Sequence, residues 1–301
     1  MLTTEVVTRT PRPVRTALAA GLGFVLAVAG CGTAGAPSSA PVISVVTGNW
    51  ALAQIASEVG GSHATVVDVV PAGANPRTAP LTTASAATVR AAAVVVIVGG
   101  GYQPTLEQAA TSASHVVALD PAYGAAADGP WLVPGAMSKL AAALAAAMTA
   151  ANPEARATYS NGVDDVTAEM GSLSADFQSS LSDCARKVIV TPDSQWAAMS
   201  SRFGLVDRSI GALSTPDAAQ VRAAAVAVRA ARATTLFSEP WVPDATILAA
   251  ASSTGTKIKT LDTLAGTPAG GWPKGATYTR LMENDLAMLT SALQCSQIGQ
   301  N

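Results

Sequence analysis

The chain has 301 residues, a formal net charge of −2 and only 13% charged residues. No block of Lys or Arg stands out beyond the first fifteen residues, so we expect no nucleic-acid partner. The length is enough for one large domain or two smaller ones, each with its own core. The sequence contains no run of 18 or more apolar residues that would predict a membrane span.

Residues 1–30 have the pattern of a bacterial export signal. Three arginines precede an apolar run over residues 17–29, which is shorter than the roughly 20 residues needed to cross a bilayer. The next residue, Cys31, follows Ala-Gly, an arrangement that resembles a lipobox, in which the cysteine is lipidated. An ordinary signal peptide with an incidental cysteine is the alternative. We expect an extracytoplasmic protein that is lipid-anchored to the cell membrane through Cys31.

Residues 31–41 are rich in Gly, Ala, Pro and Ser, and this composition predicts a flexible tether that cannot bury a core. Beyond the tether, short β-branched runs alternate with segments of helical periodicity. This alternation predicts a parallel sheet with helices on its faces. The expected strands are 42–46, 64–70, 93–98 and 115–119, and the expected helices are 48–60, 83–92 and 106–112.

The pattern changes after residue 133. An Ala/Leu-rich helix is expected over residues 134–150, and Pro153 opens a second helix because proline fits a first helical turn. That second helix is expected to continue to about Leu181, with Gly162 and Gly171 as its only internal breakers. It would link two halves of the chain.

The alternation of strands and helices then resumes. The sequence therefore predicts an α/β fold with two four-stranded parallel-sheet lobes joined by a long helix. Ligands of open α/β sheets bind beyond the carboxyl ends of the strands, so the ligand cleft is expected between the lobes. The expected divisions are the N-terminal lobe at 42–150, the linking helix at 151–184 and the C-terminal lobe at 185–301.

Cys184 and Cys295 are the two cysteines left after lipidation. In an oxidising compartment a disulfide is the default for such a pair. The alternative is that both are free thiols that ligate a metal. No His or Cys lies two to four residues after either cysteine, so the sequence favours the disulfide.

Several short motifs follow one another in a set order along the chain. They are Glu58-Val-Gly-Gly61, Val69-Val-Pro-Ala-Gly73, Asn75-Pro76, Trp131-Leu-Val-Pro134, Asn152-Pro-Glu154, Arg202-Phe-Gly-Leu205, Phe237-Ser-Glu-Pro240 and Leu261-Asp262. Their order resembles that in the metal-specific solute-binding proteins of bacterial ABC transporters, the zinc/manganese class, over about residues 42–293. The resemblance implies two α/β lobes joined by a rigid helix, an ABC permease as partner, a monomer, and a transport role rather than an enzymatic one.

The resemblance also implies where a metal would bind. The family uses three His and one Asp, or two His and two carboxylates, to hold zinc or manganese. Two of these positions keep a carboxylate, Asp193 and Asp262, which are the expected metal ligands. The other two carry Arg77 and Gly129 where the family has His. Arginine stays protonated and offers no lone pair, so the implied metal site is degenerate and binds zinc or manganese weakly or not at all.

Three explanations of this degenerate site stay open. The same scaffold binds a non-metal ligand, for instance an anionic one, or acts as an accessory protein. Alternatively, the guanidinium of Arg77 replaces the metal and pairs with Asp193 and Asp262 across the cleft. The third explanation is that Asp128 and neighbouring carboxylates rebuild a weak metal site.

Three further residues follow strand ends on the cleft side: Glu239, Trp196 and Trp241. Each is a candidate cleft-lining residue, with core packing as the alternative for the tryptophans and a structural role for the glutamate. The chain has only two histidines, and neither lies beside a nucleophile motif. The sequence shows no group of residues arranged for acid/base or nucleophilic catalysis, so we do not expect the protein to be an enzyme.

Overall fold

The computed structural model describes residues 41–119 and 129–296. The expected signal peptide, Cys31 and Asp128 lie outside these residues, as does the tether up to residue 40. In the part that is described, no helix combines the length and the apolar character needed to cross a bilayer.

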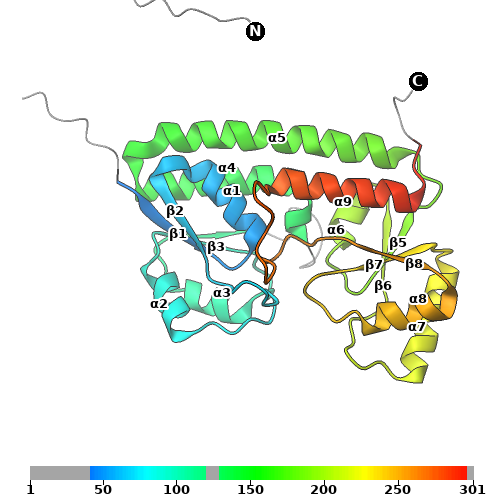
Figure 1. Cartoon of the computed structure of the whole chain (residues 1–301). Coiled ribbons are helices and arrows are strands. Elements are labelled where there is room, and N and C mark those ends of the chain that lie inside the picture. Colours follow the sequence, from blue (N-terminus) through cyan, green and yellow to red (C-terminus); the bar gives the residue numbers. More distant parts are fainter. Residues whose placement is uncertain (1–40, 120–128, 297–301) are drawn as a thin grey trace, which may run out of the picture. The chain divides into compact units, whose positions relative to one another are not determined.

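The first half of the described chain forms a four-stranded parallel sheet in the order β2-β1-β3-β4. Strands and helices alternate as the sequence predicts, and helices lie on the faces of the sheet (Figure 1). The elements are β1 (Ile43–Thr47), α1 (Trp50–Gly60), β2 (Ala64–Asp68), α2 (Thr83–Ala91), β3 (Val94–Ile97), α3 (Pro104–Ala110) and β4 (Val116–Ala118).

Helix α1 begins where Asn49 caps it. The side chain of Asn49 accepts a hydrogen bond from the backbone N–H of Leu52 over 3.2 Å, which satisfies one free donor of the first turn. One face of the helix carries apolar side chains at helical spacing, and Leu52, Ile55 and Val59 are fully buried. The same face packs on the first sheet and on the long helix described next.

Two helices run side by side in the middle of the chain, α4 (Pro134–Ala151) and α5 (Arg156–Ser182) (Figure 1). A 3₁₀ turn, η4 (Pro153–Ala155), separates them, and α5 has 27 residues, as expected for the linking helix. Gly162 lies inside α5 rather than breaking it. A Cβ at Gly162 would come within 2.7 Å of the Cα of Val59, so the glycine allows α5 to approach α1 closely.

The second half of the described chain corrects one expectation. A single four-stranded sheet was expected here, whereas the structure has two parallel pairs, β5-β6 and β7-β8. Strands β5 and β7 are neighbours without forming a ladder. Short apolar runs predict that strands exist, but pairing depends on how closely two backbones approach, which such runs do not encode.

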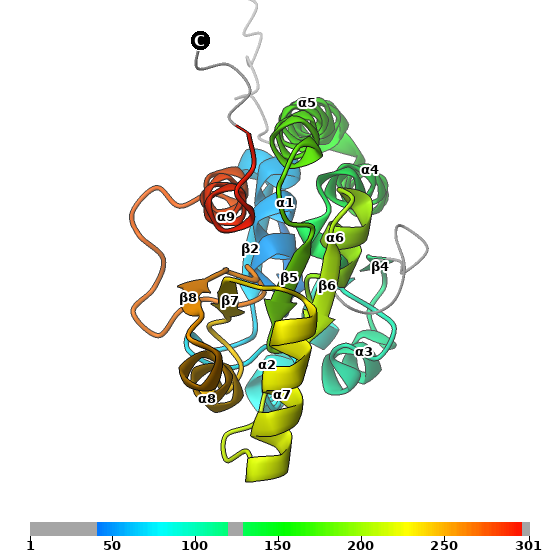
Figure 2. The same cartoon turned by 90° about the vertical axis from the view of Figure 1, so that its right-hand side faces the viewer.

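The pairs lie between α5 and α9 on one side and α7 and α8 on the other (Figure 2). Helix α7 has a capping box in which Asp217 and Gln220 satisfy backbone donors reciprocally. The elements of this half are β5 (Val188–Thr191), α6 (Ala197–Arg202), β6 (Val206–Ser209), α7 (Ala218–Ala230), β7 (Thr235–Ser238), α8 (Ala245–Thr254), β8 (Lys257–Thr260) and α9 (Tyr278–Leu293).

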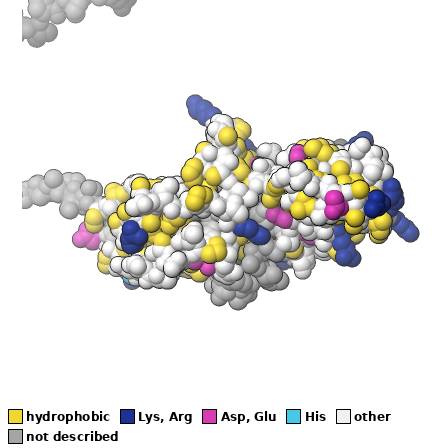
Figure 3. Space-filling view, turned by 90° about the horizontal axis from the view of Figure 1, so that it is seen from below, with side chains coloured by type: hydrophobic (Ala, Val, Ile, Leu, Met, Phe, Trp, Pro, Cys, Tyr) yellow, Lys and Arg dark blue, Asp and Glu magenta, His cyan; other side chains and the backbone are white. Residues whose placement is uncertain are grey.

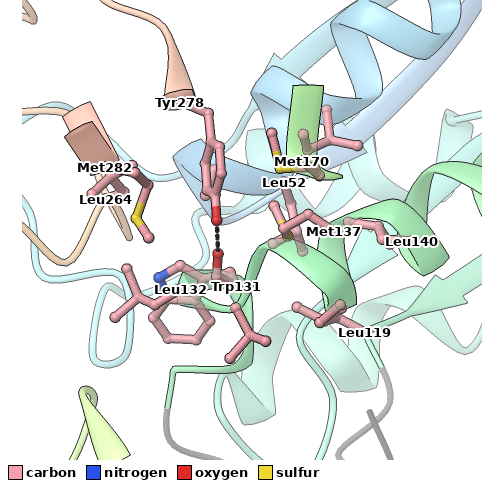
Figure 4. Packing of buried hydrophobic residues seen from close by; sticks show 14 of the residues in the cluster. Leu52, Leu119, Trp131, Leu132, Met137, Leu140, Met170, Leu264, Tyr278 and Met282 are labelled. Carbon is pink, nitrogen blue, oxygen red and sulfur yellow. Dashed lines mark hydrogen bonds between the residues drawn. The ribbon is translucent and has the colours of Figure 1, made fainter. Parts of the chain in front are cut away.

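One hydrophobic core joins both halves. It contains Leu52 from α1, Met170 from α5 and Met282 from α9, all nearly or fully buried. The hydroxyl of Tyr278 donates to the backbone carbonyl of Trp131 over 2.7 Å within this core (Figure 4). The described residues therefore pack as one compact unit, and the boundaries of two separate lobes stay a prediction.

Candidate functional site

The candidate residues follow the carboxyl ends of strands, as parallel sheets place ligand sites. Asp193 follows β5, Glu239 follows β7 and Asp262 follows β8, while Arg77 lies in the loop between β2 and α2. Acidic and basic side chains are sparse and interspersed on the face of the molecule seen in Figure 3.

Asp193, Gln195 and Glu239 form the centre of the candidate site. The backbone N–H of Gln195 donates to Oδ1 of Asp193 over 2.9 Å. The side-chain Nε2 of Gln195 donates to Oδ2 of Asp193 over 2.9 Å and lies 3.5 Å from Oε2 of Glu239. One amide nitrogen thus bridges two carboxylates from two different strand ends.

Glu239 is only 4% exposed, and its pKa is raised well above the usual range. Burial is the main cause, because desolvation disfavours the charged carboxylate. The negative charge of Asp193, to which Glu239 is hydrogen-bonded, and that of Asp207 raise the pKa further, whereas the positive charge of Arg77 lowers it. Two other carboxylates and one guanidinium therefore act on the Glu239 carboxyl.

Arg77 is exposed, and its guanidinium is near enough to act electrostatically on both Tyr102 and Glu239. Its guanidinium carbon lies 5.1 Å from the ring centroid of Tyr102, a cation–π distance. Gln103 holds the loop in place, since its Nε2 donates to the carbonyl of Pro76 over 2.7 Å and to that of Gly48 over 2.7 Å. This arrangement brings a positive charge close enough to act on Glu239.

The loop that carries Arg77 is also tied to the other half of the chain. Asn75 Nδ2 donates to the backbone carbonyl of Trp241 over 2.8 Å, and its Oδ1 accepts from the backbone N–H of Arg77 over 2.9 Å. The backbone N–H of Gly73 donates to the carbonyl of Thr267 over 2.7 Å. These bonds bring the β2–α2 loop to the loops that follow β7 and β8.

Gly129 has no space for a side chain. Its φ of 72° is in the left-handed region, and an added Cβ would lie 1.7 Å from the carbonyl oxygen of Gln195. Gly129, which the resemblance implies stands at a histidine position of the family, is therefore closed to a side chain by the backbone of the candidate site itself.

Asp262 has a different set of neighbours. Its Oδ1 accepts from the backbone N–H of Leu264 over 2.9 Å, and its own backbone N–H donates to Oδ1 of Asp285 over 2.9 Å. Burial raises the pKa of Asp262 to about 6, and it raises that of Asp285 well above the usual range. These bonds order the turn after β8, and the pairing of Asp262 with Arg77 stays a prediction.

The two candidate tryptophans differ. Trp196 is fully buried in the shared core, so of the two roles that the sequence left open the structure favours core packing over cleft lining. A side chain with no exposed surface is unable to line an open cleft. Trp241 is partly buried against the same core, and its backbone, through Asn75, connects the two halves of the chain.

The structure brings Cys184 and Cys295 together, with the Sγ atoms 1.97 Å apart, as expected for a disulfide pair. A backbone bridge joins the same two residues, so the segment after α9 is held against the end of α5. The two cysteines lie at the far end of α9 from Tyr278 and do not belong to the candidate metal site.

A zinc site of the usual composition does not fit these residues. Within residues 41–119 and 129–296, no group of three or more His, Cys, Asp and Glu side chains has a metal-binding arrangement. His63 belongs to the 3₁₀ turn η1 (Gly61–His63), and His115 directly precedes β4. The donors that do gather, around Asp193 and Glu239, are oxygens.

Sequence reasoning did not identify Gln195, Tyr102 or Gln103 as site residues. One signal was present, because Gln195 lies two residues after Asp193 and Tyr102 directly follows the glycines that end a strand segment. Such loop positions are where α/β proteins gather functional groups. Amides and phenols are common in loops, however, and nothing in their spacing distinguished these three.

Comparison with models of protein families identifies the family of the chain. A family model described as ZnuA, zinc-uptake complex component A periplasmic, matches residues 45–292. The chain belongs to this family. Its members are extracytoplasmic, metal-binding solute-binding proteins that take part in transport and are not enzymes. A comparison with curated protein sequences found no match.

Solved structures share the fold. The Zn(II)-bound ZnuA-like domain of Streptococcus pneumoniae AdcA is 19% identical, with a TM-score of 0.71 over 84% of this chain and 99% of that one. The laminin-binding protein Lmb of Streptococcus agalactiae, described as having adhesin and metal-transporting activity, is 23% identical, with a TM-score of 0.72 over 83% and 99%. The metal-dependent lipoprotein YcdH of Bacillus subtilis is 20% identical, with a TM-score of 0.72 over 83% and 99%.

Proposed function

We propose that the chain is an extracytoplasmic solute-binding lipoprotein that delivers a divalent metal ion, manganese or zinc, to an ABC permease in the cytoplasmic membrane. The observation that carries this proposal is the family match over residues 45–292. The position of Asp193 and Glu239 after parallel strands supports cargo binding at that edge, because α/β proteins bind ligands there.

The anchoring part of the proposal rests on the lipobox at Cys31 and on the tether of residues 31–41. A disulfide between Cys184 and Cys295 supports the same location, because such bonds persist in oxidising compartments. Two lobes, 42–150 and 185–301, joined by the linking helix, would present the cargo to the permease.

Metal uptake tests the delivery role. Cells that lack the chain should take up radiolabelled manganese or zinc more slowly in metal-limited medium, and expression of the wild-type chain should restore the rate. Unchanged uptake of both metals would contradict the proposal. Cell fractionation tests the anchor, since Cys31→Ser should release the protein into the medium or leave it unprocessed. A variant that stays in the membrane at the normal processed mass would contradict lipidation.

A further inference from the structure

We propose that Asp193, Glu239 and the side-chain amide oxygen of Gln195 form an all-oxygen site for a hard divalent cation such as Mn²⁺. This inference rests on the proposed function, in that the cargo is taken to be a divalent metal ion. It goes further by naming a donor set that replaces the missing histidines. It also gives a role in binding to Gln195 and Glu239.

The three side chains converge on one point. Nε2 of Gln195 is 2.9 Å from Asp193 Oδ2 and 3.5 Å from Glu239 Oε2. An amide NH₂ carries partial positive charge, so in this state it occupies the place of a cation between two carboxylates. A small cation at the same point would be within reach of oxygens from both strand ends.

Two oxygens at this point lack partners. Oε1 of Glu239 and Oε1 of Gln195 are buried, and neither has a hydrogen-bond partner in the described part of the chain. The residues themselves are 4% and 5% exposed. Buried polar atoms are nearly always satisfied, so each unpartnered oxygen requires an explanation, and a bound cation provides one for both.

The amide of Gln195 is able to switch roles. The terminal torsion of a glutamine side chain has two broad energy minima that are half a turn apart, so rotation between them exchanges the positions of Nε2 and Oε1. In one orientation the amide donates to the carboxylates of Asp193 and Glu239. In the other it presents Oε1 toward the point that the two carboxylates share. Cation binding therefore requires rotation of this one amide, with no rearrangement of the backbone.

The surrounding charge favours a cation. Asp207 lies beside the site, where its Oδ1 is 2.6 Å from Oγ1 of Thr191. The charges of Asp193 and Asp207 oppose ionisation of Glu239, whereas that of Arg77 favours it. A divalent ion between Asp193 and Glu239 would offset the repulsion between these two carboxylates.

The donor set also indicates which cations fit. Carboxylate and carbonyl oxygens suit Mn²⁺, Mg²⁺ and Ca²⁺, whereas zinc sites usually include imidazole or thiolate. Arg77 and Gly129 supply neither of these donors. The chain should therefore hold manganese without the strong zinc preference of a histidine-rich site.

Electron paramagnetic resonance of free Mn²⁺ provides the test, because the signal of the hydrated ion is lost when the ion binds. The purified full-length chain should bind one Mn²⁺. Glu239→Gln and Gln195→Ala should each weaken Mn²⁺ binding at least about tenfold. Even residues that only hydrogen-bond to a metal ligand contribute that much to metal affinity. Glu58→Gln is the matched control, a partly buried carboxyl on α1 outside the site, and should bind like the wild type.

Gln195→Glu should tighten Mn²⁺ binding, because it places a carboxylate oxygen where the wild type has an amide oxygen. Misfolding would weaken binding, so it is unable to produce this gain in affinity. Wild-type affinity in Glu239→Gln, or no Mn²⁺ binding by the wild-type chain, would overturn the inference. The proposed function fails by a different measurement, unchanged metal uptake in cells that lack the chain. A chain that supports uptake but binds metal independently of Glu239 would refute only the donor set.

Discussion

The backbone carbonyl of Gln195 lies where a side chain on Gly129 would have to begin. A Cβ at Gly129 would be 1.7 Å from that oxygen, and the residue has a φ of 72°. Gly129→Ala should therefore lower the free energy of unfolding by about 2 kcal/mol or more, because it combines left-handed strain with a steric clash. Urea-induced unfolding measures this loss.

Gly135→Ala is the control for this prediction. A Cβ at Gly135, in the first turn of α4, would meet nothing within 4 Å. Alanine is a better helix former than glycine by about 0.5–1 kcal/mol, so this variant should be as stable as the wild type or more stable. Equal stability of the two variants would show that Gln195 does not close the Gly129 position.

Arg77→His should increase the affinity for zinc. Arg77 acts electrostatically on Glu239, so an imidazole at this position would place a nitrogen donor near the carboxylates. The gain should be at least about tenfold, or about 1.4 kcal/mol, measured by isothermal titration calorimetry at neutral pH. Arg77→Lys keeps the positive charge without a free lone pair and should show no gain. An equal effect of both variants would place Arg77 away from the metal position.

Asp68, at the end of β2 and outside the proposed donor set, predicts a pH dependence of stability. Burial raises its pKa to about 7, from a model-peptide value near 4. The folded state therefore binds the proton more tightly than the unfolded state. The stability from this group is fully present below about pH 4 and is lost as pH rises toward 7.

Asp68→Asn tests this dependence. The amide keeps an oxygen that can accept the 3.0 Å bond from the N–H of Val70, and it removes the charge. At pH 8 the free energy of unfolding of the variant should exceed that of the wild type by on the order of 1–3 kcal/mol, so the variant should unfold at a higher temperature. At pH 4 the two chains should differ little. An equal difference at both pH values would rule out the titration of Asp68 as the cause.

Reduction should destabilise the chain through Cys184 and Cys295. The two cysteines are 111 residues apart in sequence, and closing a loop of that length stabilises by about 4–5 kcal/mol in the chain-entropy model. Unfolding in the presence of a thiol reductant should occur at lower denaturant concentration than without it. The double variant Cys184→Ser, Cys295→Ser should be indifferent to the reductant. A wild-type chain that is equally indifferent would contradict the bond.

The fold was predictable where the pattern along the chain was strong. The Val-rich runs that became β1 and β3 are short and β-branched, and each ends at or just before a glycine. Pro153 opens the turn η4 that leads into α5, close to where the sequence placed the start of the helix. The pairing among the four strands β5, β6, β7 and β8 was not predictable. It depends on backbone approach between short strands, and side-chain periodicity carries no information about that distance.

The site was predictable only in its outline. The position of Glu239 at a strand end made it a candidate, and the family resemblance implied Asp193; both lie in one charged group. The resemblance also implied Asp262, which orders a turn with Asp285, and its role as a metal ligand stays a prediction. The role of Gln195 depends on the conformation of a loop, in which side-chain directions are set by tertiary contacts.

Equilibrium binding of manganese to the purified wild-type chain, with the bound metal counted per chain, tests the central claim most directly. The account predicts saturable binding of one Mn²⁺ per chain. An absence of saturable binding for manganese and for zinc alike would contradict it, and would favour the same scaffold acting on a non-metal ligand or as an accessory protein.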